Sequence, residues 1–274
     1  EWLENLPKHW KFDRIKDVCE KITGGGTPKS SISEYWEDGE ITWISPTDFG
    51  KQKGNKYITT SEKKITGLGV QKSSATFLPK GTVIMSSRAS IGEPKIAGAI
   101  VTTNQGFISY ITNYKLLNNY LFYCIECQLG DYFLNIASGT TFMEISRRMA
   151  SIENIPLPPF QEQKAIAEYL DKATERIDRI IAIKQEQLVK MEEMRKSAFF
   201  RACTQGLNSD TEFIEINDGH ITKMPSHWKY QRIKRGCKNI DTGKTPSSGE
   251  PEYFIDGTIE WFAPECFNDG LIID

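Results

Sequence analysis

The sequence predicts an α+β protein in which a mixed α/β domain with short strands is followed by a long α-helix. Three observations predict this organisation: short β-rich segments in the first part of the chain, an unbroken helical pattern after them, and a repeat that follows the helix. The expected ranges are 1–155 for the domain, 156–206 for the helix, 207–222 for a linker and 223–274 for an incomplete second copy of the domain.

Short segments rich in β-branched and aromatic residues, bounded by Gly, Pro, Asn and Ser, predict the strands of the first domain. They are Ile41–Ile44, Thr82–Ser86, Ala99–Val101 and Phe107–Ile111. Asn118–Leu129 predicts a short helix, and Ile15–Ile22 also has helical spacing. Many loops separate these elements, so we expect function on loops that a strand scaffold holds in place.

The long helix is predicted by a glycine- and proline-free run between Pro158-Pro159 and Gly206. About 40 helical residues would span about 60 Å. Apolar residues three and four positions apart form a narrow seam flanked by charge, which is typical of a helix that pairs with another long helix as a coiled coil. The seam consists of Ile166, Leu170, Ala173, Ile177, Ile180, Leu188, Met191, Met194 and Ala198. The alternative is a core helix of one globular domain.

An internal repeat relates residues 7–49 to residues 225–267 without gaps, with 21 identities in 43 positions. The shared residues include the pairs His9/His227, Trp10/Trp228, Cys19/Cys237 and Trp43/Trp261. This similarity predicts two related halves, each a domain followed by a connector. The second copy stops at Asp274, so we expect either a fragment or a short form that finds its missing half elsewhere.

Composition limits the possible classes of function. The 274 residues carry a net charge of −2, so a nucleic-acid surface would have to be a local basic patch. No apolar run approaches membrane-spanning length, and a cytoplasmic location is the default. Cys124 and Cys127 form a CxxC pair, but buried thiols are expected there more than a metal or redox site.

We find no convincing catalytic centre, and we expect neither a metal nor a cofactor. Leu157-Pro158-Pro159-Phe160 looks like the catalytic tetrapeptide of DNA amino-methyltransferases, but Leu157 cannot accept a hydrogen bond from a target amine. Gly243-Lys244-Thr245 ends like a phosphate-binding loop, yet Lys238 stands where that loop needs a glycine. We interpret the first motif as the entry to the long helix.

Three stretches that together span nearly the whole chain carry a family resemblance. The first is the domain opening, Leu6-Pro7 with His9-Trp10 and Thr27-Pro28, which returns in the second copy. The second combines Ser86–Gly92 with Thr103–Phe107. The third joins Ile155–Pro159 to Glu162-Gln163, Ile166-Ala167 and Leu170-Asp171. In these stretches the chain resembles the specificity subunit of type I DNA restriction–modification systems.

The resemblance implies a non-catalytic subunit shaped like a dumbbell, in which two target-recognition domains are held apart by two long antiparallel helices. Each domain would read one half of a split sequence in double-stranded DNA. The implied partners are methyltransferase subunits, with motor-nuclease subunits joining through the complex. Because a second long helix is not present in this sequence, we expect the seam to pair with a second copy of the chain as a homodimer.

Candidate DNA-contacting residues are loop positions with side chains suited to phosphates or base edges. They are Lys29, Ser30, Lys51, Lys53, Lys56, Lys80, Arg88, Asn104, Gln105, Thr140, Thr141, Arg147 and Arg148. Arg88 could instead be a structural arginine, and Asn104-Gln105 could cap a turn. Arg147 and Arg148 could touch a partner subunit.

Two alternative hypotheses assign the chain to other classes of function. A divergent methyltransferase or nuclease would bind a cofactor or metal, and no motif supports this. A coiled-coil adaptor that binds protein would show no salt-dependent affinity for DNA.

Overall fold

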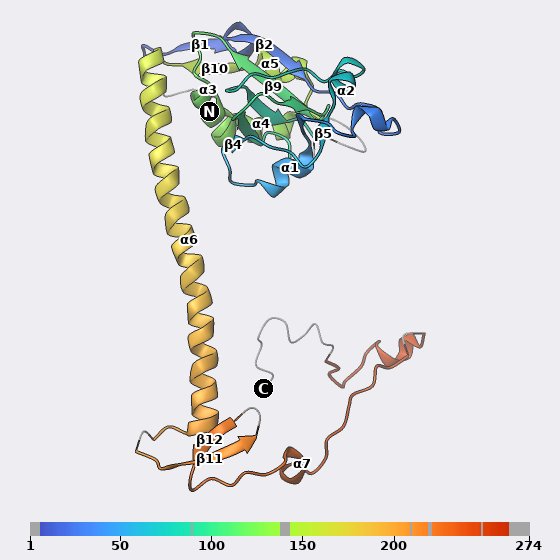
Figure 1. Ribbon diagram of the computed structural model, residues 1–274, viewed down its shortest axis with the longest axis vertical. Coiled ribbons are helices and arrows are strands. Elements are labelled where there is room, and N and C mark those ends of the chain that lie inside the picture. The colour runs from blue at the N-terminus through green and yellow to red at the C-terminus, as the bar shows by residue number, and fades with distance from the viewer. Residues whose placement is uncertain are drawn as a thin grey trace. The chain divides into compact units, whose positions relative to one another are not determined.

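The computed structural model describes residues 6–88, 90–137, 143–208, 210–218, 221–247 and 249–262. The chain divides into two compact units, Glu1–Glu186 and Gln187–Asp274. One helix, α6 (Phe160–Gln205), begins in the first unit and ends in the second (Figure 1).

The centre of the first unit is a five-stranded sheet with the order β2-β9-β6-β7-β4. Its strands are β2 (Cys19–Gly24), β9 (Phe107–Thr112), β6 (Val83–Ser86), β7 (Pro94–Ala97) and β4 (Tyr57–Ile58). All neighbours are antiparallel except β4 and β7. The strands β6 and β7 are buried along their whole length, as expected for a sheet covered on both faces.

A three-stranded sheet with the order β5-β3-β8 stands beside it in the same unit. Its strands are β5 (Lys64–Ile65), β3 (Ile41–Ile44) and β8 (Thr102–Thr103). Short helices α1 (Pro46–Lys51) and α2 (Gly67–Gln71) and the 3-10 turn η2 (Ser33–Tyr35) connect or flank these strands. A capping box begins α1, in which the Ser45 backbone N–H donates to Asp48 Oδ2 over 2.8 Å.

The strands β1 (Lys11–Arg14) and β10 (Asn154–Leu157) form a separate antiparallel pair, which places Lys11 opposite Leu157. The 3-10 turn η1 (Ile15–Asp17) follows β1, and α5 (Arg147–Ile152) precedes β10. Because β10 pairs with the start of the chain, the first unit continues beyond residue 155, the limit expected from the sequence.

Most strand predictions are confirmed, and two local predictions are wrong. Ile15–Ile22 is not a helix: only η1 is helical, and β2 begins at Cys19, where Ile22 pairs with Tyr110. Ala99–Val101 is not a strand: it is a bend in which Val101 forms an isolated bridge with Leu78. The nearby strand is β7, which lies earlier in the chain and ends at Ala97. The sequence did not predict β7, because Pro94 at its first position argues against a strand.

The predicted helix Asn118–Leu129 is longer than expected. It comprises α3 (Asn118–Cys124), the π-helical turn η3 (Ile125–Leu129) and α4 (Gly130–Ile136). Buried residues of these segments, such as Tyr120, Leu121 and Phe133, pack with Val83 and Tyr110 of the central sheet in the main hydrophobic core. At η3 the π-helical turn coincides with a close approach of Gly130 to Gly92.

The long helix α6 begins directly after Pro158-Pro159, as predicted, but Pro156 and Leu157 belong to β10 rather than to the helix. Gln163 in the first turn is fully buried, and its amide accepts from Leu117 N and donates to Pro158 O. Ala167 belongs to the main core. Gly206 ends the helix with a φ of +76°.

The second unit contains the hairpin β11 (Phe213–Asp218) and β12 (Ile221–Pro225), then α7 (Ile233–Gly236) and the 3-10 turn η4 (Pro251–Tyr253). Strand β11 therefore lies within 207–222, the range expected to be a linker. The ring of Trp228, the repeat counterpart of Trp10, lies against Gly206 at the end of α6.

Candidate nucleic-acid interface

Two loops that are far apart in the sequence meet beside the central sheet. The Thr27 hydroxyl donates to Gln105 Oε1, and Gly26 N donates to Thr103 O over 2.9 Å. The approach depends on glycine, because a Cβ on Gly25 would lie 2.0 Å from Asn104 O. The structure thus brings the loop that carries Lys29 and Ser30 against the loop that carries Asn104 and Gln105, with the contacts made by Gly25, Gly26 and Thr27.

A hollow of about 650 Å³ borders these loops, with Trp43 in its wall. The indole of Trp43 is 6% exposed and donates to Gly26 O over 2.8 Å, and Trp36 meets it edge-on at 5.1 Å between ring centroids. Polar side chains complete the lining, including Thr27, Ser30, Ser33, Lys63 and Lys64. The Trp43 wall is thus buried and hydrogen-bonded, whereas the polar residues of the rim are exposed.

The neighbours Asn104 and Gln105 have different tasks. Asn104 Oδ1 accepts from Gly106 N over 2.9 Å, so its side chain caps the turn between β8 and β9. Gln105 is exposed, and the Thr27 hydroxyl orients its amide oxygen. No residue in the described ranges accepts a hydrogen bond from the Gln105 amide nitrogen, which remains available to a base edge.

Among the basic candidates, three are engaged with carboxylates, namely Arg88, Lys51 and Lys56. Arg88 forms an ion pair of 3.0 Å with Glu144 and also bridges it through the backbone. Lys51 pairs with Glu62. Four other candidates, Lys29, Ser30, Lys53 and Lys80, are exposed, whereas Thr140 and Thr141 lie outside the described residues.

Lys56 is not a solvated loop lysine. Its side chain is only 16% exposed, and Nζ donates to Asp171 Oδ1 on α6. The same ammonium lies 4.4 Å from the centroid of the Tyr123 ring, and the Tyr123 hydroxyl donates to Asp171 over 2.6 Å. Burial, with the bond to Asp171, raises the pKa of Tyr123 to about 12. Lys56 therefore fixes α6 to the domain instead of facing DNA.

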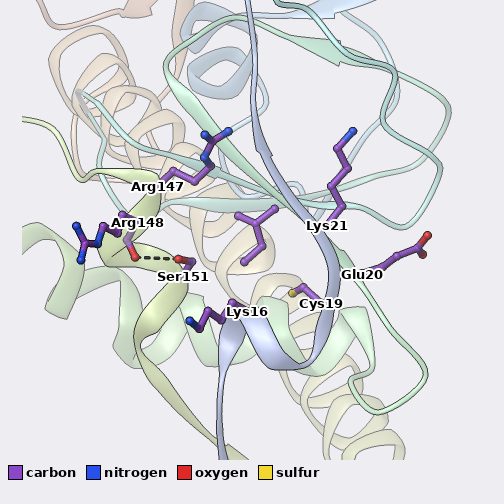
Figure 2. A pocket seen from close by; sticks show the side chains of 8 residues that line it. Lys16, Cys19, Glu20, Lys21, Arg147, Arg148 and Ser151 are labelled. Carbon is purple, nitrogen blue, oxygen red and sulfur yellow. Dashed lines mark hydrogen bonds between the residues drawn. The ribbon is translucent and has the colours of Figure 1, made fainter.

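A second hollow, of about 420 Å³, lies between α5, η1 and β2. It is lined by four cations, Lys16, Lys21, Arg147 and Arg148, and by Cys19, Glu20, Ile22 and Ser151. Figure 2 shows Arg147 and Arg148 on one side and Lys21 on the other, while the Glu20 carboxylate points away from the arginines. We call these eight residues the basic pocket.

The only thiol of the basic pocket is not a nucleophile. Burial raises the pKa of Cys19 to about 12, so this side chain stays protonated at neutral pH. Sequence reasoning found Arg147 and Arg148 but missed Lys16 and Lys21, because Asp17 and Glu20 alternate with them along the chain. Folding separates these charges, since Asp17 accepts from Arg14 over 2.7 Å.

The apolar seam of α6 falls into two parts. Ile166 and Leu170 pack against the core of the first unit, and Ala173 is half-buried. From Ile177 onward the seam is exposed, by 55% at Ile177, 64% at Leu188 and 70% at Met194. The first two seam positions thus attach the helix to its own domain, and those from Ile177 onward remain uncovered.

Neither a metal cluster nor a membrane span emerges from the described part of the chain. No group of three or more His, Cys, Asp or Glu there could hold a metal ion. None of the described helices is long and apolar enough to cross a bilayer.

The chain belongs to the family described as the type I restriction modification DNA specificity domain, whose sequence model matches residues 7–191. It is 33% identical over 273 residues to the type I restriction enzyme MjaIX specificity subunit of Methanocaldococcus jannaschii. It is also 32% identical over 180 residues to the type I restriction enzyme EcoR124I/EcoR124II specificity subunit of Escherichia coli. The matches cover 99% and 61% of this chain, respectively.

The chain spans only part of the length of these relatives, 61% of the first and 43% of the second. The fold is also similar to solved structures. A chain from a structure of complex assembly and conformational transition in a type I R-M system matches with a TM-score of 0.59 and 23% identity, covering 73% of this chain and 47% of that one. The HsdS subunit of Thermoanaerobacter tengcongensis matches with a TM-score of 0.52 and 21% identity, covering 73% and 46%.

Proposed function

We propose that this chain is a non-catalytic DNA-recognition subunit whose first unit reads one half of a split duplex sequence. The observation that carries the proposal is the junction of the two polar loops, where the Thr27 hydroxyl orients the exposed amide of Gln105. A glutamine can pair with an adenine edge in the major groove, and lysines such as Lys29 supply phosphate contacts. Family membership supports the same assignment.

The long helix α6 would fix the distance between two such readers. A stiff helix keeps two half-sites in register, whereas a flexible linker would let their spacing drift. Its attachment through Asp171, Gln163 and Ala167 supports this role, because these contacts hold the helix in one orientation on the first unit.

The catalytic activities would be supplied by other polypeptides. We propose that methyltransferase subunits dock on this chain and that motor-nuclease subunits join the complex through them. Such a complex acts on cellular DNA and would therefore work in the cytoplasm of a prokaryote.

DNA recognition is tested by selecting bound sequences from a random duplex library with the full chain. We expect a short enriched motif and an affinity that falls steeply as salt rises. Binding that shows neither enrichment nor salt dependence would exclude the proposal and favour a protein-binding adaptor.

We further propose that the exposed part of the α6 seam pairs with a second copy of this chain. Leu188→Asp is expected to convert a dimer to a monomer in size-exclusion chromatography with light scattering, since it places a charge in an apolar seam. Ala182→Asp is the matched control, because residue 182 lies on the opposite side of the helix from Ile180. A wild-type chain that is monomeric at high concentration would refute the pairing.

A further inference from the structure

The basic pocket is unusual in a chain of net charge −2. Lys16, Lys21, Arg147 and Arg148 are exposed, and none of them forms an ion pair with a described residue. By contrast, Arg14 one turn away is neutralised by Asp17. Four cations and one carboxylate, Glu20, line one hollow, so the pocket carries a net positive charge and is suited to an anion.

The four cations stand on a fixed scaffold. Lys16 lies between Ile15 and Val18, which are both fully buried, and Ala150 anchors α5 in the same core. Beside Lys21 the ladder between β2 and β9 shifts its register at Glu20, because Cys19 pairs with Thr112 and Lys21 with Ile111. Such a bulge re-aims side chains, and here Glu20 points away from the arginines (Figure 2).

Strand β2 connects the basic pocket to the polar loops. It begins at Cys19, in the pocket, and ends at Gly24, directly before the loop that carries Thr27 and Ser30. Its six residues span about 20 Å at about 3.3 Å each. Phosphates recur about every 3.4 Å along each strand of B-DNA, so a duplex that is read at the loops and runs along β2 would present phosphates to the pocket.

The internal repeat keeps positive charge in the same segment. Lys234 stands at the position of Lys16, and Lys238 replaces Glu20. The second copy therefore carries at least as much positive charge at this turn as the first, although the individual positions differ.

We propose that the basic pocket binds the sugar–phosphate backbone of the DNA that the first unit reads. This inference rests on the proposed DNA-recognition function and assigns the pocket to affinity and register, not to base preference. Lys16 and Lys21 act as point charges, and Arg147 and Arg148 supply planar forks that match phosphate oxygens. A partner protein with an acidic surface is the competing occupant.

The experiment measures binding of the full chain to a random-sequence duplex by fluorescence anisotropy from low to high salt. Removing one phosphate contact lowers the slope of log affinity against log salt by about 0.9, which corresponds to about eightfold weaker binding near 0.1 M salt. We expect this loss for Arg148→Ala and partial rescue by Arg148→Lys. Glu20→Gln is expected to strengthen binding, because it removes the only carboxylate of the pocket.

Lys115→Ala is the matched control, because it removes one positive charge from an exposed side chain elsewhere in the first unit. An unchanged melting temperature shows that each variant is folded. If the wild type binds DNA and Arg148→Ala keeps the wild-type slope, the pocket assignment is wrong while the DNA function stands. If Arg148→Ala loses only capture of methyltransferase subunits, the acidic-protein alternative replaces it. A wild type that binds no duplex at low salt rejects both proposals.

Discussion

Trp10 donates its indole N–H to Oε1 of Glu162 over 3.0 Å, which ties the start of the domain to the first turn of α6. The second oxygen of the same carboxylate lies 3.0 Å from His9 Nε2. Both residues belong to the His-Trp motif that returns in the second copy as His227-Trp228. In the first copy the motif therefore has a structural role at the N-terminus of α6.

The contacts of Glu162 predict a contribution to the stability of the fold that depends on pH. The bonds from His9 and Trp10 lower the pKa of Glu162 below its ordinary value of 4.5. A group with a lowered folded-state pKa stabilises the fold above its unfolded-state pKa and loses that contribution as pH falls through the folded-state pKa. We expect Glu162→Gln to reduce the loss of melting temperature below pH 4.5, measured by circular dichroism against wild type. Identical acid profiles would contradict this.

The ion pair between Lys56 and Asp171 is expected to hold α6 on the first unit. Asp171→Asn should lower the free energy of unfolding by about 1–2 kcal/mol, because it weakens charge-assisted bonds from Lys56 and Tyr123. Chemical denaturation measures the change. The control is Lys164→Ala, which breaks an exposed pair with Glu168 at 3.8 Å and should change stability by less than about 1 kcal/mol. Equal effects of both variants would exclude a special role for Asp171.

The neighbours Asn104 and Gln105 should separate stability from recognition. Asn104→Ala removes the cap on Gly106 N and is expected to destabilise the domain by about 1 kcal/mol. Gln105→Ala should leave the melting temperature unchanged but reduce discrimination at one base position by about 1–3 kcal/mol. Competition between matched and single-mismatch duplexes measures this. Unchanged sequence preference in Gln105→Ala would remove Gln105 from the interface.

Arg88 and Glu144 allow a test of whether Arg88 reaches DNA. Both side chains are about two-fifths exposed, so breaking their pair should alter stability by less than about 1 kcal/mol. We expect Arg88→Ala to weaken duplex binding and Glu144→Gln to strengthen it, since Glu144 neutralises the guanidinium. A large loss of melting temperature in Arg88→Ala with unchanged DNA affinity would instead mark a structural arginine.

Sequence periodicity was sufficient for elements with a strong local signal, but it missed β7 and mistook the start of β2 for a helix. The seam, the two prolines and Gly206 delimited α6, and β-rich runs such as Ile41–Ile44 gave strands. The site was harder, since its pairings are distant in the chain. Lys56 meets Asp171 across 115 positions, and no local pattern announces that contact.

The same limit explains why the sequence did not predict which part of the seam packs on the first unit. The spacing of apolar residues shows which helix face is buried, but not what buries it. Ile166 and Leu170 continue the pattern of Ile177 without interruption, yet they pack on the helix's own domain. The basic pocket was not predicted for a related reason, since Lys16 and Lys21 lie near Arg147 only after folding.

The pairing of Lys11 with Leu157 has a consequence for synthesis of the chain. Strand β1 emerges from the ribosome before its partner β10, which follows 143 residues after it, measured from Lys11 to Asn154. At about 5–20 residues per second, the wait is roughly 7–30 s. During this interval the nascent chain exposes an unpaired strand edge, which is a site of aggregation. Cotranslational chaperones or slow translation near Leu157 would therefore affect the yield of folded protein.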